Sequence, residues 1–113
     1  RMRANVLEAQ AGVYDIPYGT PATSTADCAA NSCDSVTMVD FDQTKWKTAL
    51  AATLPAGDGE ITTAVSGFAA VPAVDATITI RWDESRQGAT GTDCPNDDSN
   101  GEDLACFQMI VTL

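Results

Sequence analysis

Residues 74–82, with the sequence VDATITIRW, are the stretch that decides the fold class of this chain. Its apolar and polar side chains alternate and would fall on opposite faces of a strand, one with Val74, Ala76, Ile78, Ile80 and Trp82 and the other with Asp75, Thr77, Thr79 and Arg81. A period of two is typical of a strand whose one face covers a core while the other meets solvent. The stretch therefore predicts a half-buried antiparallel strand, with Trp82 in the core.

Two further segments read as strands of the same sheet. Residues 60–65 are rich in threonine, and residues 104–113 would form the last strand. The side chains of this last strand alternate between one set with Phe107, Met109, Val111 and Leu113 and another with Cys106, Gln108, Ile110 and Thr112. Because the second set is less polar than that of 74–82, we expect both faces of the last strand to be partly covered.

The first residues predict a helix over 1–14. Apolar side chains recur there about every fourth position, at Met2, Val6, Ala9 and Val13. This spacing places them on one face of a helix, and that face would cover the core.

A second helix is expected to end just before Pro55, which cannot continue a helix. Asp40 or Asp42 can cap its first turn. One face carries an apolar line made of Trp46, Leu50 and Leu54. We therefore expect Trp46 to lie in the core.

Helices that precede contiguous strands predict an α+β fold. The length is that of one globular domain, which would span residues 1–113. Its parts would be the helix over 1–14, a loop and the second helix over 15–59, and an antiparallel sheet over 60–113.

The charge and the residue composition of the chain exclude several classes of function. Sixteen acidic residues against six basic ones give a net charge of −10, which disfavours nucleic acid as a partner. The absence of histidine excludes Ser/His and Cys/His catalytic pairs and His-ligated zinc. Glu60, Asp83 and Glu84 are carboxylates near strand ends, but they belong to no recognisable catalytic motif. We expect neither an enzyme nor a bound cofactor.

The four cysteines favour disulfides and an exported protein. Zinc is the alternative, but its ligands usually form close pairs such as C-x2-C, which this spacing does not match. Of the three connectivities that four cysteines allow, we expect the two local pairs, Cys28–Cys33 and Cys94–Cys106. Loop closure would contribute about 2 kcal/mol for the first pair and about 3 kcal/mol for the second.

Residues 93–103 are unusually acidic. The pattern N-x-D-x-N-G over residues 96–101 mimics the opening of an EF-hand calcium loop. The match fails where the bidentate glutamate is due, because that position holds Phe107. We expect a solvated loop without a metal, in which the weak calcium candidates are Asp97, Asp98 and Asn100.

Several landmarks follow one another along the chain in a definite order. The series runs from RMRAN at 1–5 through Cys28 and Cys33, D-x3-W-x3-L at 42–50 and L-P-x-G-x-G at 54–59 to I-x-I-x-W-D at 78–83. This series resembles the PilV-type minor pilins of bacterial type IV pili, and it spans nearly the whole chain.

The resemblance implies a pilin fold, in which a long N-terminal helix packs its second half on an antiparallel sheet. Residues 1–14 would be the end of that helix, followed by a second short helix and a disulfide-bounded C-terminal region. The Cys94–Cys106 disulfide would then lie at the exposed edge of the sheet. Family members begin with a cleaved leader and an apolar half-helix that anchors the subunit in the inner membrane. We therefore expect this chain to be the soluble part of a longer protein.

The resemblance also implies a role in assembling the pilus, in adhesion and in twitching motility. The partners would be other minor pilins, the major pilin and a tip adhesin, first at the inner membrane with a periplasmic domain and then in the extracellular pilus, at its tip. We expect the contacts to come from the sheet edge and from the polar side of helix 1–14, with Arg3, Asn5 and Gln10. The alternatives are a type II secretion pseudopilin and a secreted calcium-dependent adhesin domain.

Overall fold

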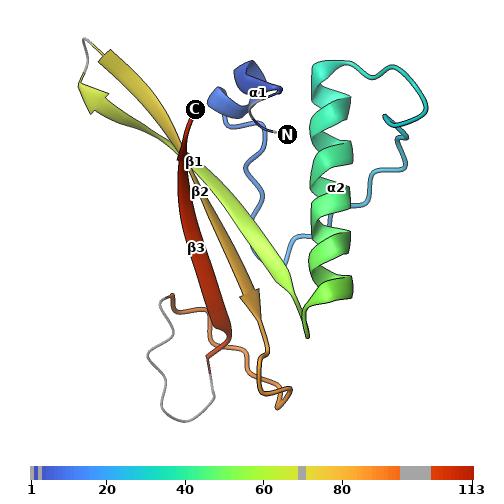
Figure 1. Ribbon diagram of the computed structural model, residues 1–113, viewed down its shortest axis with the longest axis vertical. Coiled ribbons are helices and arrows are strands. Elements are labelled where there is room, and N and C mark those ends of the chain that lie inside the picture. Colours follow the sequence, from blue (N-terminus) through green and yellow to red (C-terminus); the bar gives the residue numbers. More distant parts are fainter. Residues whose placement is uncertain (1, 3, 69–70, 95–102) are drawn as a thin grey trace.

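The computed structural model describes residues 2, 4–68, 71–94 and 103–113 and shows an α+β arrangement (Figure 1). In chain order the elements are α1 (Val6–Gln10), α2 (Ser35–Thr53), β1 (Asp58–Phe68), β2 (Val71–Trp82) and β3 (Ala105–Thr112). The strands form one antiparallel sheet in the order β1-β2-β3. The expected fold class and sheet orientation are therefore confirmed.

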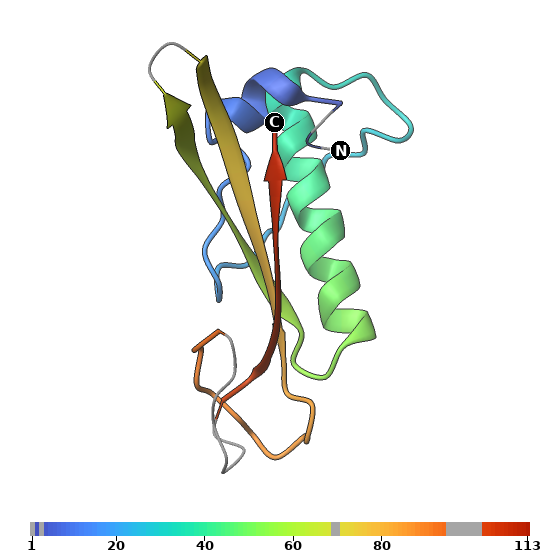
Figure 2. The ribbon, with the colours of Figure 1, turned by 60° about the vertical axis from the view of Figure 1, so that its left-hand side comes forward.

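Two views show how the layers are arranged. The helix α2 lies beside the sheet, and residues 83–94, which follow β2, lie at the end of the sheet away from α1 (Figures 1 and 2). Neither described helix is both long enough and apolar enough to span a membrane.

The helix α1 is shorter than the helix predicted over 1–14. It ends at Gln10, and Gly12 follows with φ of +79°, a left-handed conformation that glycine adopts without a steric penalty. The chain then turns, so that Ile16 forms an antiparallel bridge with Ile61 of β1. The prediction was wrong because it continued the apolar spacing through a glycine that ends the helix.

The helix α2 begins earlier than predicted. Its N-cap is Asp34, whose carboxylate accepts a hydrogen bond of 2.7 Å from the backbone N–H of Thr37. Asp40 and Asp42, the predicted caps, lie inside the helix. Because Asp34 satisfies an N–H group that the first turn leaves open, the helix gains more than one additional turn at this end. The predicted end is confirmed, since Leu54 is the C-cap and Pro55 follows it.

The core lies where α1 and α2 meet the sheet. Its buried members come from both helices, from the turn after α1 and from β1, and they are Ala9, Tyr14, Ile16, Val39 and Ile61. Trp46 and Ile78 are partly buried against this cluster. Trp82 is also only partly buried, so neither tryptophan is as enclosed as the apolar lines predicted.

Contact between α2 and β1 depends on Gly59. A Cβ atom placed there would lie 2.6 Å from Cη2 of Trp46 and 3.0 Å from Cδ1 of Leu50. The indole can therefore approach the β1 backbone only because this position has no side chain.

The faces of β2 and β3 differ from the predicted pattern. On the polar face of β2, Thr79 and Arg81 are only 1% and 7% exposed. Gln108 of β3 bonds to Thr79, and Tyr18 and Thr92 lie against Arg81. On β3 the opposite holds, since Phe107, Met109 and Ile110 are 55%, 43% and 66% exposed. The prediction that both faces of the last strand are partly covered is therefore wrong at these three residues, because the long helix α2 packs on β1.

We predict that Gly59→Ala lowers the free energy of unfolding by about 2 kcal/mol, because the added methyl group forces Trp46 out of its position. Urea unfolding of the disulfide-bonded chain measures this change. The control is Thr62→Ala at an exposed position of the same strand, which should change stability by about 0.5 kcal/mol or less. Equal stability of the two variants would contradict the close contact between Trp46 and Gly59.

Candidate functional site

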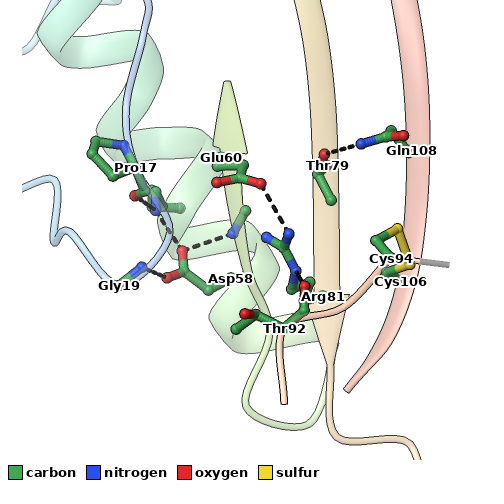
Figure 3. A network of polar contacts seen from close by, with 12 residues as sticks. Pro17, Gly19, Asp58, Glu60, Thr79, Arg81, Thr92, Cys94, Cys106 and Gln108 are labelled. Carbon is green, nitrogen blue, oxygen red and sulfur yellow. Dashed lines mark hydrogen bonds and ion pairs between the residues drawn. A yellow bond between two sulfur atoms is a disulfide. The ribbon is translucent and has the colours of Figure 1, made fainter. Parts of the chain in front are cut away.

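A network of polar contacts lies at the end of the sheet near the β2–β3 loop (Figure 3). Arg81 of β2 lies at its centre, and its Nη2 is 2.9 Å from Oε1 of Glu60 on β1. Its Nε donates a hydrogen bond of 3.0 Å to the backbone oxygen of Thr92. The ring centre of Tyr18 lies 5.3 Å from the guanidinium carbon. One side chain thus connects two strands, the loop after β2 and the turn after α1.

Because Arg81 is buried, the main role of this network is to stabilise the fold. Removing a charge from water is costly, and the Glu60 carboxylate and the Tyr18 ring offset part of that cost. The Nη1 atom of Arg81 is buried without a hydrogen-bond partner in the described part of the chain. Glu60, which the sequence suggested only as a weak catalytic candidate, neutralises this cation.

A second charged pair joins α2 to the start of β1. Nζ of Lys47 lies 2.6 Å from Oδ1 of Asp58 and donates a further hydrogen bond of 3.1 Å to the backbone oxygen of Pro17. The other carboxylate oxygen of Asp58 accepts a hydrogen bond of 2.7 Å from the N–H of Gly19. The turn after α1, the helix and the strand therefore meet at one carboxylate.

The environment of Asp58 changes its pKa. Burial alone would raise the pKa, but hydrogen bonds from Lys47 and from the N–H groups of Gly19 and Gly59 favour the ionised form. The net result is a pKa below the ordinary value of 3.8. The same carboxylate, together with burial, raises the pKa of Tyr18, burial being the larger cause. Neither shift creates an acid or base poised near neutral pH.

Both expected disulfides are present. Cys28 and Cys33 close a short loop before α2, with Cα atoms 5.5 Å apart. Cys94 and Cys106 join the loop after β2 to the start of β3, with Cα atoms 5.8 Å apart. The second disulfide adjoins the Arg81 network, because Cys106 pairs directly with Arg81 in the β2–β3 ladder. It therefore holds the loop that covers the buried cation.

Asp83 organises the turn that follows β2. Asp83 is only 6% exposed, and its carboxylate accepts a hydrogen bond of 2.8 Å from the N–H of Gly88. Backbone hydrogen bonds, first from Gly88 and also from Gln87, lower its pKa. Its own N–H donates to the backbone oxygen of Pro55 at 2.8 Å. Glu84, the neighbouring candidate, is exposed in the same turn.

The contact residues predicted on the first helix have different surroundings. Arg3 lies outside the described residues. Asn5 precedes α1 and donates a hydrogen bond of 2.9 Å to the backbone oxygen of Ser35. Gln10 is exposed. Asn5 thus joins the two helices of this chain, and Gln10 presents its side chain to solvent.

The calcium candidates Asp97, Asp98 and Asn100 also lie outside the described residues. Within the residues that are described, no group of three or more histidine, cysteine, aspartate or glutamate side chains could hold a metal ion.

Sequence reasoning missed two features of the molecule. The buried Arg81 network has no local signal, because Tyr18 and Thr92 are distant from Arg81 in sequence. The exposure of the apolar side chains of β3 has no local signal either, because an uncharged stretch such as residues 105–112 is also typical of a strand that is covered.

No family model, curated protein or solved structure matches this chain.

We predict that Asp58→Asn lowers the free energy of unfolding by about 3 kcal/mol at pH 7, because it leaves the buried Lys47 ammonium without its counter-charge. Thermal and urea unfolding measure the loss. The matched control is Asp40→Asn on the exposed side of α2, which should be nearly neutral.

The same variant tests the direction of the pKa shift. A lowered pKa in the folded state stabilises the protein above pH 3.8, and this contribution disappears as the pH falls through the folded-state value. Stability should therefore fall less steeply below about pH 4 in Asp58→Asn than in the unaltered chain. Identical slopes would contradict the role assigned to the Lys47–Asp58 pair.

Proposed function

We propose that this chain is a PilV-type minor pilin, a subunit that acts by protein–protein association in the complex that primes type IV pilus assembly. In this role it contacts other minor pilins, the major pilin and a tip adhesin, and supports adhesion and twitching motility. Its own residues make or break no covalent bond in that process. Before assembly the full-length subunit is anchored in the inner membrane with its folded part in the periplasm, and afterwards it belongs to the extracellular pilus.

The observation that carries this proposal is that three separate motifs of the resemblance meet in space. Trp46, in D-x3-W-x3-L, lies against Gly59 in L-P-x-G-x-G. Pro55 of the latter motif accepts a hydrogen bond from the N–H of Asp83, the last residue of I-x-I-x-W-D. Short motifs of this kind are individually common. Their mutual contact supports the view that they form one structural unit and are not independent coincidences.

Other features agree with an assembly subunit. The chain has two disulfides, as an exported protein would. Its charged side chains at the sheet end serve as structural links, with Arg81 and Lys47 both buried against carboxylates. The apolar side chains exposed on β3 offer a surface for a partner.

We predict that deleting the full-length gene from its source bacterium strongly reduces surface pili and twitching, and that the unaltered gene restores both. Electron microscopy of shed pili and the diameter of subsurface twitching zones measure the effect. The gene carrying Thr62→Ala should also complement, because the exposed Thr62 side chain contributes little to stability.

The deletion also separates the alternatives. Normal piliation in the deletion strain, combined with loss of type II secretion into the medium, would replace the proposal with a pseudopilin. Normal piliation and normal secretion would exclude both assembly roles.

A further inference from the structure

The outer edge of β3 is available for main-chain pairing. In the antiparallel β2–β3 ladder, Leu113 donates a backbone hydrogen bond of 2.9 Å to Val74. Alternate residues of β3 therefore bond to β2, and the residues between them turn their N–H and C=O groups outward. The outward set includes Gln108 and Ile110. In the described part of the chain no strand pairs with this edge, because β3 is the last strand in the sheet order.

The beginning of the same edge is already covered. Leu104 donates a backbone hydrogen bond of 2.8 Å to Gly91, and the Cys94–Cys106 disulfide holds this loop in place. The available segment therefore starts after Cys106 and is long enough for a short added strand.

β3 lacks the usual protection of an edge strand. Natural edge strands carry charges, proline or bulges that prevent them from pairing with other chains. The β3 sequence, ACFQMIVT, has no charge and no proline, and it pairs with β2 without interruption. Ile110 is 66% exposed on one face, and Phe107 and Met109 are 55% and 43% exposed on the other. Such a strand is an aggregation hazard unless a partner covers it.

The opposite edge of the sheet, formed by β1, is partly paired with another segment of the chain. Ile16 and Ile61 exchange two backbone hydrogen bonds of 3.0 Å, so the chain covers the β1 edge at Ile61 with its own segment. A Cβ added at Gly12 would lie 3.1 Å from Oγ1 of Thr63, which shows how closely this segment follows β1. The fold thus covers the β1 edge next to Ile61 with its own chain, whereas no described segment pairs with the β3 edge beyond Cys106.

The charge of the chain indicates what kind of partner can pair. Two copies, each with a net charge of −10, would repel one another. Asp93 is exposed close to the Cys94–Cys106 disulfide, at the end of the sheet where β3 begins. A segment with basic residues at its ends would be attracted, whereas its centre must be uncharged to lie beside Ile110 and Met109.

We propose that the outer edge of β3, at Gln108 and Ile110, binds an extended, uncharged segment with basic flanks from a different protein, which adds a fourth strand to the sheet. This inference rests on the proposed function, in which the different protein is another pilus subunit. Main-chain hydrogen bonds supply much of the attraction in this mode of recognition, and alternate side chains supply the selectivity.

The experiment uses the full-length subunit, tagged and co-expressed with the minor pilins of its source bacterium. Ile110→Pro removes an outward N–H without removing a hydrogen bond to β2, and it should reduce recovery of partner pilins at least tenfold. Ile110→Ala removes only the side chain and should reduce recovery much less. The matched control is Val65→Pro, which makes the same kind of change at an exposed, outward-facing position of β1, and it should leave recovery unchanged.

Two further measurements keep the test decisive. Amide hydrogen exchange should show Gln108 and Ile110 protected in the complex and exchanging freely in the isolated subunit. If Ile110→Pro does not fold, the single variant Ile110→Lys, which keeps every β2–β3 backbone hydrogen bond and the bond from Gln108 to Thr79, should also reduce recovery tenfold.

The outcomes separate the two proposals. If the unaltered subunit recovers no pilin, the proposed function fails. If it recovers pilins and a folded Ile110→Pro or Lys variant recovers them equally well, only the β3 edge is overturned. A subunit dimer in sedimentation that Ile110→Pro abolishes would overturn the choice of a different protein as partner.

Discussion

The position of Trp46 over Gly59 is the constraint on which the rest of the structure depends. It places α2 close to the backbone of β1, and this closeness allows Lys47 of the helix to reach Asp58 at the start of the same strand. Because Asp58 also accepts the Gly19 N–H, the turn after α1 is held beside β1, where Ile16 can bridge to Ile61. A single missing side chain thus determines how helix, turn and sheet fit together.

The two faces of the sheet are covered by different kinds of contact. The α2 side of β1 is covered by apolar packing, whereas the end of the opposite face is covered by a buried cation with its carboxylate and aromatic partners. Burying Arg81 costs solvation energy, which direct contacts with Glu60 and Thr92 offset. These polar contacts hold the segment after β2 in place with few apolar residues. No comparable packing covers β3, whose apolar side chains are exposed on both faces.

Much of the fold could be predicted because its signals are local. The alternation in 74–82 is a property of consecutive residues, and Pro55 ends a helix wherever it occurs. The true start of α2 also has a local signal, because Asp34 is a good N-cap residue, but Asp40 and Asp42 give the same signal further along the chain. The burial of Arg81 could not be predicted, because only the tertiary structure brings Tyr18 and Thr92 against its side chain. The exposure of β3 depends similarly on the side of the sheet that α2 occupies.

The order of the strands has a consequence for the kinetics of folding. β1 and β2 are joined by a short hairpin, so their pairing closes only a small loop, whereas β3 pairs with β2 across the long segment that follows Trp82. Loop-closure entropy therefore favours early formation of the hairpin and late docking of β3. The disulfide between Cys94 and Cys106 shortens the loop that must close, because it links β3 directly to a residue midway between the two strands. The last strand of the sheet is therefore also the last to dock, and formation of the Cys94–Cys106 disulfide speeds this step.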